Sequence, residues 1–298
     1  MDIRVLQYFL AVAREESITK AAETLHMTQP PLSRQLKDLE KEVGKQLLIR
    51  GSKRVTLTED GMLLRKRAEE MVELMEKTKA ELSTSNEIIS GDIYMGSGET
   101  EAVSTIAKVA KSLQEKYPFI RYHIYSGDAE HITERLDKGL IDFGLLVEPF
   151  DIVKYDYVRL PVKDTWGVLM RKDSPLAEKE YIIAEDLWDQ PLIISHQTSI
   201  SNEMIAWLRR DISKLNIVAT YDLVYNASRF VKMGFGYVIA LDKLINTTGE
   251  SELCFRPLYP ASEAGLCIVW KKYQVFSRAA EQFLKQIQSE FTIRSDEK

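Results

Sequence analysis

Several residue types and patterns that mark common protein classes are scarce or missing in this 298-residue chain. Two cysteines are too few for a disulfide framework. Neither the cysteines nor the four histidines stand at metal-ligand spacing. No apolar run approaches the length of a membrane span, and Asp2 and Arg4 interrupt the start where a signal peptide would be apolar. The chain has no Walker loop, no Gly-x-Ser-x-Gly elbow and no His-Glu-x-x-His motif. These absences predict a cytoplasmic protein that is not an enzyme and holds no metal or cofactor.

Residues 18–40 have the pattern of a short helix, a tight turn and a second helix. Ser17 or Thr19 can cap the first helix, because a hydroxyl at that position accepts from an unpaired backbone N–H. Thr28 can cap the second, and Pro30 fits its first turn, where no N–H is needed. The spacing therefore predicts a helix-turn-helix.

The second helix of this pair is predicted to be amphipathic. Its apolar residues recur at three- and four-residue steps and are expected to face inward: Leu32, Leu36, Leu39 and Val43. Four polar side chains remain for the opposite face: Gln29, Ser33, Arg34 and Lys37. Arginine and glutamine can form bidentate hydrogen bonds with guanine and adenine, whereas serine and lysine suit phosphate contacts. An ordinary helix pair with a solvated polar face is the alternative.

A small hairpin with a basic tip is predicted after Gly44, which can end the second helix. The tip residues suited to phosphate neutralisation are Arg50, Lys53 and Arg54. Residues 1–67 contain 13 Lys and Arg against 9 Asp and Glu, although the whole chain contains 40 against 45. Because the positive charge gathers around the predicted reading helix, we expect residues 1–58 to form a winged helix-turn-helix domain that binds double-stranded DNA.

About 60 residues at the N-terminus resemble, without a gap, the signature of LysR-type transcriptional regulators. The residues that carry the resemblance are Leu6, Phe9, Val12, Ala13, Ser17, Ala21, Ala22, Leu25, Gln29, Pro30, Leu32, Ser33, Leu36, Leu39, Glu40, Gly44, Leu47, Arg50, Arg54, Val55, Leu57, Thr58 and Gly61. Ile18 and Leu48 stand where the family commonly has phenylalanine, and both keep an apolar core position. The residues expected to contact DNA are Ser17, Thr28, Gln29, Pro30, Ser33, Arg34, Lys37, Arg50, Lys53 and Arg54.

Residues 59–90 are predicted to be a long linker helix followed by a hinge rich in Ser, Thr and Asn. A helix over 58–86 would be about 40 Å long and would extend past the predicted domain over residues 1–58. Its apolar residues follow a 3.5-residue repeat, which favours pairing with another helix over packing on its own domain. The residues expected at a dimer interface are Leu64, Ala68, Met71, Met75 and Leu82. A homodimer would match an imperfect inverted repeat in DNA. The resemblance further implies a homotetramer, and RNA polymerase is a candidate partner.

Residues 91–298 alternate predicted strands and helices, a pattern typical of an α/β domain with a mostly parallel sheet. The predicted strands are 93–96, 120–125, 143–147, 165–170, 192–195, 217–220, 237–241 and 265–270, and the predicted helices are 101–116, 128–138, 200–213, 226–233 and 276–290. Four phrases resemble the LysR-type effector domain: KYPFIRYHIYSG, LDKGLIDFGLL, DLWDQPLII and VKMGFGYVIAL. The resemblance implies a two-lobed, periplasmic-binding-protein-like fold, with lobe I over 91–161 and 266–298 and lobe II over 162–265.

A small-molecule effector is expected in the crevice between the lobes, at the carboxyl ends of the strands. The loop over 96–100 could hold an anion at the start of the helix that follows. The candidate effector-binding residues are Ser97, Gly98, Glu99, Thr100, Glu148, Thr198, Ser199 and Asn226, each of which could instead be only a helix cap. Glu99 and Glu148 argue against a simple carboxylate effector, because like charges repel.

Three alternative functions stay open at this point. The first is a redox-responsive regulator that uses Cys254 and Cys267, because peroxide-sensing members of the resembled family use a cysteine pair; buried free thiols are the competing interpretation. The second is an enzyme with the same bilobal fold, which leaves the basic head unexplained. The third is a solute-binding protein for transport, which needs an export signal that the N-terminus lacks.

Overall fold

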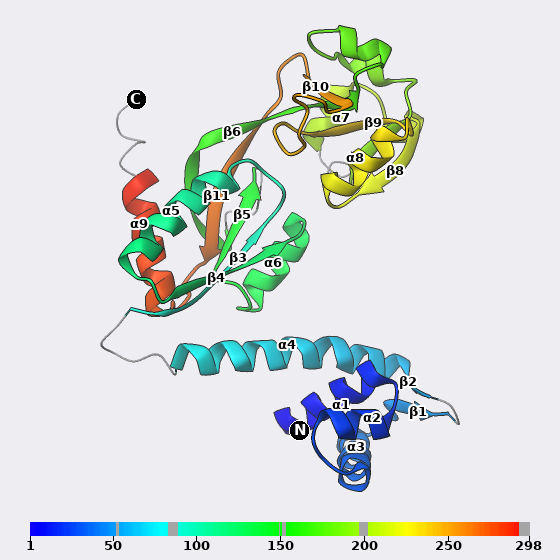
Figure 1. Cartoon of the computed structure of the whole chain (residues 1–298), viewed down its shortest axis with the longest axis vertical. Coiled ribbons are helices and arrows are strands. Elements are labelled where there is room, and N and C mark those ends of the chain that lie inside the picture. Colours follow the sequence, from blue (N-terminus) through cyan, green and yellow to red (C-terminus); the bar gives the residue numbers. More distant parts are fainter. Residues whose placement is uncertain (52–53, 83–88, 149, 151–152, 197–201, 292–298) are drawn as a thin grey trace. The chain divides into compact units, whose positions relative to one another are not determined.

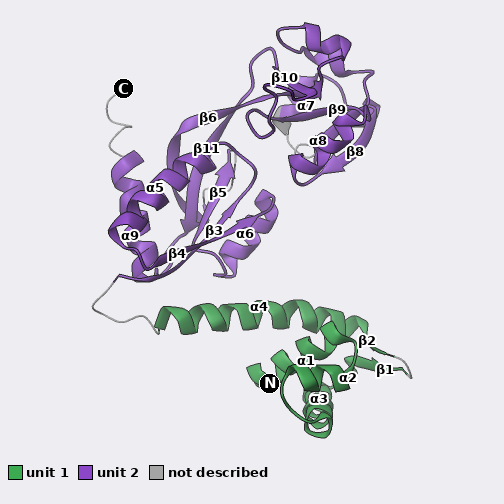
Figure 2. Cartoon of the chain, viewed as in Figure 1, with its two compact units in different colours: residues 1–83 green, residues 84–298 purple. Residues whose placement is uncertain are grey.

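The computed structural model spans residues 1–298 and describes all of them except 52–53, 83–88, 149, 151–152, 197–201 and 292–298. The chain divides into two compact units, Met1–Ser83 and Thr84–Lys298 (Figure 2). The predicted linker helix therefore belongs to the same unit as the predicted DNA-binding domain, and this domain is called the head below. No helix in the described ranges is long and apolar enough to cross a membrane.

The first unit is helical, with one small hairpin (Figure 1). Its elements are α1 (Ile3–Glu15), α2 (Ile18–Thr24), α3 (Gln29–Val43), β1 (Leu48–Arg50), β2 (Val55–Leu57) and α4 (Glu59–Leu82). The Ser17 hydroxyl accepts from Lys20 N at 3.3 Å and caps α2, and Gly44 ends α3 with a φ of 72°. Both ends were predicted from residue type, because caps are local interactions.

The core of this unit is the apolar side of α1, α2 and α3 together with the base of the hairpin. Its buried residues are Phe9, Ala11, Val12, Ala21, Ala22, Leu32, Leu36, Leu39, Leu47 and Leu48. The inward prediction was wrong for Val43, which is 40% exposed. It is the last residue of α3, and the chain turns away at Gly44 before a neighbouring element can cover it.

Helix α4 starts against the hairpin and packs along α1. Thr58 caps it, accepting from Gly61 N at 3.0 Å and donating to Gln46 O at 2.7 Å. Gly61 lies so close to the hairpin that a Cβ on it would be 2.2 Å from the carbonyl oxygen of Leu47. The first turn of α4 thus depends on a residue without a side chain.

The second unit consists of two α/β lobes (Figure 1). Lobe I contains β3 (Gly91–Ser97), α5 (Val103–Lys116), β4 (Ile120–Ser126), α6 (Ala129–Asp137), β5 (Phe143–Val147) and, at the end of the chain, α9 (Arg278–Phe291). Lobe II contains β7 (Leu192–Ser195), α7 (Asn202–Leu208), β8 (Ile217–Tyr221), α8 (Val224–Lys232), β9 (Tyr237–Leu241), β10 (Leu253–Pro257) and short 3-10 helices at Pro175–Glu178, Ala184–Leu187 and Ile212–Lys214. Two strands, β6 (Tyr155–Arg171) and β11 (Glu263–Lys271), join the lobes.

The strand order in the described residues is β4-β3-β5-β11-β6-β9-β7-β8, with β10 also paired to β6. The prediction of a mostly parallel sheet was only partly right. Strands β3, β4 and β5 are mutually parallel in lobe I, as are β7, β8 and β9 in lobe II. However, β11 and β6 run antiparallel to their neighbours, because each carries the chain across from one lobe to the other.

Each lobe buries both faces of its sheet, as parallel strands require. In lobe I, α5 and α9 cover one face and α6 covers the other (Figure 1). Along β11, Leu266 and Ile268 accordingly join the α5 side, whereas Cys267 and Val269 join the α6 side. In lobe II, α8 covers one face, and α7 packs on the other.

Two predicted elements differ from the structure, and one strand was not predicted. The helix predicted over 200–213 is only Asn202–Leu208 within the described residues, followed by a 3-10 turn. The strand predicted at 165–170 begins at Tyr155, and β10 was not predicted. Polar residues alternate with apolar ones in the first half of β6, so it lacks the continuous apolar run that the prediction relied on.

Candidate DNA interface and effector site

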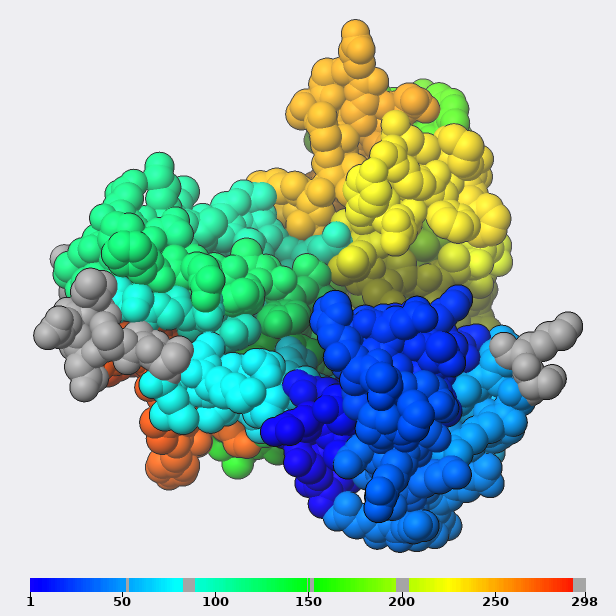
Figure 3. Space-filling model, turned by 60° about the horizontal axis from the view of Figure 1, so that its bottom comes forward, coloured from blue at the N-terminus to red at the C-terminus, as the bar shows by residue number. Residues whose placement is uncertain are grey.

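The polar face of α3 is open to solvent. Gln29, Arg34 and Lys37 are exposed and Ser33 is partly exposed. Within the described part of the chain, none of these four side chains makes a hydrogen bond or an ion pair. Figure 3, in which the first residues are blue, shows the surface of this unit. Donors on a rigid helix with no intramolecular partner can bind base edges and phosphates without first breaking a contact.

The predicted DNA contacts at the start of α2 and α3 differ in whether their side chains are already hydrogen-bonded within the protein. Ser17 is occupied as the cap of α2. Thr28 is the N-cap residue of α3 but makes no side-chain cap hydrogen bond, and it is exposed. Pro30 is exposed in the first turn of α3. Thr28 and Pro30 therefore lie beside the polar face, whereas the hydroxyl of Ser17 has a structural partner.

The basic residues of the wing, the hairpin β1–β2, are held by acidic side chains of the head. Arg50 pairs with Glu40 at 3.4 Å, and Arg54 pairs with Glu16 at 3.5 Å. Ion pairs on a protein surface contribute about 0–1 kcal/mol, so a phosphate can replace either carboxylate. Lys53 lies outside the described residues.

The predicted dimer residues of α4 divide into two sets. Ala68 is fully buried and Leu64 packs against the core of the head, so both contribute to the unit itself. Met71 is 42% exposed and Leu82 is 81% exposed, and Leu74, which was not predicted, is 41% exposed. Met75 is partly exposed. Met62 and Leu63 in the first turns of α4 are exposed as well, so apolar surface is open near both ends of the helix.

The loop after β3, which was predicted to bind the effector, has hydroxyl groups that already form hydrogen bonds within the protein. The Ser97 hydroxyl donates to Gly98 O at 2.6 Å, and the Thr100 hydroxyl accepts from Ala102 N at 3.1 Å. Both hydroxyls are buried. Helix α5 begins only at Val103, so the loop is separated from the helix start that was expected to hold an anion.

The Thr100 hydroxyl also donates to Asp164, which lies on β6 where this strand crosses between the lobes. The next residue, Thr165, donates its backbone N–H to Asp242 of lobe II at 2.9 Å. Burial raises the pKa of Asp164 above its usual 3.8, the Thr100 hydrogen bond opposes this rise, and the nearby Asp242 carboxylate adds to it. Consecutive residues of the crossing strand are therefore bonded to opposite lobes.

Glu99 connects the same loop directly to lobe II. Its carboxylate accepts a hydrogen bond from Val224 N, the first backbone N–H of α8. Leu223, at the N-cap position, has an apolar side chain that cannot accept a hydrogen bond from a backbone N–H of α8. Burial, and secondly the Glu99 carboxylate, raise the pKa of the Tyr221 hydroxyl at the end of β8. Glu99 thus serves as the cap of a helix in the other lobe.

Glu148 has a partner that the sequence did not predict. Arg159 on β6 donates to it at 2.6 and 3.1 Å, and a Cβ on Gly265 would meet its carboxylate at 2.3 Å. The sequence argument that Glu148 repels anionic ligands is therefore weakened, because Arg159 neutralises its charge. Asn226 is exposed and is the third residue of α8 rather than its start. The predicted candidates Thr198 and Ser199 lie outside the described residues.

The two cysteines are separate buried thiols. Cys267 is paired with Arg159 and Cys254 with Met170, eleven positions apart along β6. At about 3.3 Å per residue this separation is roughly 35 Å, far beyond the roughly 7 Å that a disulfide allows between Cα atoms. Burial, with the Glu148 carboxylate, raises the pKa of Cys267 to about 12, which disfavours the reactive thiolate. The structure contradicts the interpretation of these two residues as a redox pair.

Comparison with known proteins agrees with both halves of this geometry. The family model described as bacterial regulatory helix-turn-helix protein, lysR family, matches residues 3–62. The model described as LysR substrate binding domain matches residues 87–292. The chain belongs to the LysR family. It is therefore a DNA-binding transcriptional regulator with a substrate-binding domain, as predicted, and nothing supports the bilobal-enzyme alternative.

Individual relatives are named as transcriptional regulators. The chain is 37% identical over 236 residues to the HTH-type transcriptional regulator BsdA of Bacillus subtilis, covering 74% of this chain and 81% of that protein. It is 29% identical over 278 residues to the Hca operon transcriptional activator HcaR of Escherichia coli, covering 91% and 92%.

Among solved structures, full-length CbnR complexed with its target DNA has a TM-score of 0.76 at 17% identity, covering 97% of this chain and 99% of that one. Full-length BenM has a TM-score of 0.56 at 22% identity, covering 99% and 98%. These two likenesses support the LysR fold.

Proposed function

We propose that this LysR-family regulator reads an imperfect inverted repeat in double-stranded DNA through the exposed face of α3. The supporting observation is that Gln29, Ser33, Arg34 and Lys37 lie together on that face without intramolecular partners. Arg34 reads a base edge, whereas Arg54 of the wing neutralises a phosphate. The protein is proposed to act in the cytoplasm, where bacterial DNA lies. RNA polymerase is the partner expected at a regulated promoter.

The test compares Arg34→Ala with Arg54→Ala on an operator located by footprinting upstream of the protein's own gene. Arg34→Ala should weaken binding to this operator by about 1–3 kcal/mol and relax the preference at one base pair. Arg54→Ala should weaken specific and unrelated duplexes alike, and should reduce the slope of log affinity against log salt by about 1. Fluorescence anisotropy over a salt series measures both quantities.

Lys285→Ala is the matched control, because it removes the same charge from α9 of the other unit, where Lys285 is 59% exposed. It should leave both affinities unchanged. Equal effects of the Arg34 and Arg54 variants on every duplex would contradict the proposed division between base and phosphate contacts.

We further propose that the protein is a homodimer through the exposed apolar residues of α4, and that dimers associate into tetramers. Met71, Leu74 and Leu82 are exposed along the second half of α4, and such a stripe is stabilised when a second helix covers it. Sedimentation of the full chain at micromolar concentration should show dimers or larger species. A strictly monomeric protein would contradict this proposal, because an inverted repeat needs two heads.

The effector is proposed to bind between the lobes, next to the crossing strands β6 and β11. The loop over 97–100 comes from lobe I, and Asp242 and the start of α8 come from lobe II. A ligand that binds one arrangement of the lobes better than another shifts the population of that arrangement. Operator footprints recorded with and without a metabolite library test whether such a ligand changes DNA binding.

A further inference from the structure

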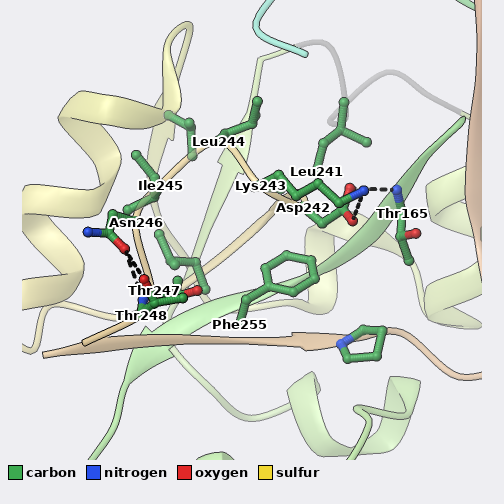
Figure 4. Close-up of a pocket in the computed structure, with 14 residues that line it drawn as sticks. Thr165, Leu241, Asp242, Lys243, Leu244, Ile245, Asn246, Thr247, Thr248 and Phe255 are labelled. Carbon is green, nitrogen blue, oxygen red and sulfur yellow. Dashed lines mark hydrogen bonds and ion pairs between the residues drawn. The ribbon is translucent and has the colours of Figure 1, made fainter. Parts of the chain in front are cut away.

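A pocket of about 560 Å³ lies in lobe II, on the side of its sheet that α8 covers (Figure 4). All of the residues that line it fall between 165 and 257, so lobe II forms it without any part of lobe I. Asp242 and Val224 also border the proposed effector site between the lobes, but the rest of the lining does not. A volume of this size fits a small organic molecule, since ligand pockets are typically about 300–1,000 Å³.

The floor of the pocket is hollow because short side chains meet on three neighbouring strands. Pro257 of β10 is paired with Gly167 of β6, and Gly167 is paired in turn with Ala240 of β9. Two positions further along, Phe255 and Leu169 are paired on the same face. A Cβ on Gly167 would be 2.1 Å from the Phe255 ring, so this ring lies over the glycine and forms an apolar wall.

The loop over 242–248 forms another wall, and it supplies uncharged polar groups. The Asn246 side-chain oxygen accepts from the backbone N–H and the hydroxyl of Thr248, both at 2.9 Å (Figure 4). Among the described residues, three groups of the lining have no hydrogen-bond partner: the Asn246 amide nitrogen and the hydroxyls of Thr165 and Thr247. These groups can donate to or accept from a ligand without breaking a contact within the protein.

The charged residues of the lining neutralise each other. Asp242 pairs with Lys243 at 3.2 Å, and it also accepts from Thr165 N at 2.9 Å (Figure 4). A charged ligand would have to separate this pair or place its own charge on the apolar floor without a partner. Burying an unpaired charge costs far more than burying a hydrogen-bonded neutral group, so the lining favours an uncharged ligand.

We infer that this pocket is a second ligand site, which takes an uncharged molecule with an apolar body and a hydrogen-bonding group. The apolar body lies against Ala240 and the Phe255 ring, and the polar group meets Thr165, Asn246 or Thr247. The site belongs to lobe II alone. It goes beyond the proposed effector in the cleft and does not depend on it.

The experiment uses 2-naphthamide, 2-naphthoate and 2-naphthylmethylammonium, which share one ring system and differ in charge. Each is titrated into the full-length protein by calorimetry. 2-Naphthamide should bind saturably, and both ions should bind at least roughly tenfold more weakly, because the pocket offers neither of them a free opposite charge. Hydrogen exchange with bound 2-naphthamide should slow over 242–249 and 253–257 and stay unchanged over 96–102, the loop of lobe I.

Thr247→Phe places a ring in the pocket and should weaken 2-naphthamide binding at least roughly tenfold. Thr220→Phe is the matched control, since it makes the same change at an exposed residue of β8 outside the lining and should leave this affinity unchanged. Ala240→Val fills the floor instead if circular dichroism shows that Thr247→Phe fails to fold. The inference is overturned by absent 2-naphthamide binding, equal affinity for the three compounds, protection of 96–102 instead of 242–249, or unchanged binding in the filled variant.

Discussion

The hydrogen bond between Thr100 and Asp164 gives a sharp test of how the loop over 97–100 is fixed to the crossing strand β6. Thr100→Val keeps the shape of the side chain but removes both the donor to Asp164 and the acceptor for Ala102 N. Asp164 is only 2% exposed, so water cannot replace the lost donor. Leaving a buried group unsatisfied costs about 1–3 kcal/mol of the free energy of unfolding. For a unit of this size, such a loss lowers the melting temperature by about 2–12 °C.

Tryptophan fluorescence isolates the relevant unit, because all four tryptophans lie beyond residue 83. Urea unfolding followed by this signal should show a lower midpoint for Thr100→Val. Thr100→Ser is the control, since it retains the hydroxyl and loses one methyl group, worth about 0.8 kcal/mol. The cost of Thr100→Val should shrink in an Asp164→Asn background, where no buried charge depends on the donor. Equal midpoints for the Val and Ser variants would refute the reasoning.

Two further predictions concern the head and the pH dependence of the second unit. Gly61→Ala should destabilise the head by about 1–3 kcal/mol, because its Cβ would collide with the carbonyl oxygen of Leu47 at 2.2 Å. Calorimetry should show this in the transition that leaves tryptophan fluorescence unchanged, whereas Ala at the exposed neighbour Met62 should cost little. Burial raises the pKa of Asp164 above 3.8, so ionisation is harder in the folded state and wild-type stability falls as pH rises through that raised pKa. Urea unfolding from about pH 4 to pH 8 should therefore show the stability of wild type, measured relative to Asp164→Asn, decreasing with pH; a constant difference would mean that Asp164 does not titrate differently on folding.

The DNA-binding head was the most predictable part of the protein, because its signals are local. Ser17 caps a helix three residues away, and Gly44 ends α3 within its own turn. The apolar repeat of α3 placed Leu32, Leu36 and Leu39 correctly. The prediction that Val43 is buried was wrong, because periodicity does not indicate where a neighbouring element stops covering a helix.

The repeat along α4 predicted a buried stripe but not what buries each residue. The structure places Ala68 against the head, whereas Met71 and Leu82 remain exposed. A sequence repeat reports only that apolar side chains share a face. Which other segment covers that face depends on the path of the whole chain.

The contacts of the candidate effector loop were only partly predictable from the sequence. The loop over 97–100 was identified because it follows a strand and is rich in polar residues. Its partners were missed, since Asp164 and Val224 are 64 and 125 residues away from Thr100 and Glu99, respectively. The one signal for Asp164 was an acidic residue at the edge of an apolar strand, and a backbone N–H such as that of Val224 leaves no trace in a sequence.

The order of residues alone determined the reading helix, the wing, the alternation of strands and helices and the family, because each depends on spacing within one or two turns or on a contiguous motif. Only the tertiary structure decided that Arg159 neutralises Glu148, that Asp164 bonds Thr100 at the lobe crossing and that Glu99 caps α8. Charge pairing and burial depend on which distant segments meet. These contacts are made by the folded chain, when β6 and β11 carry it from one lobe to the other and back.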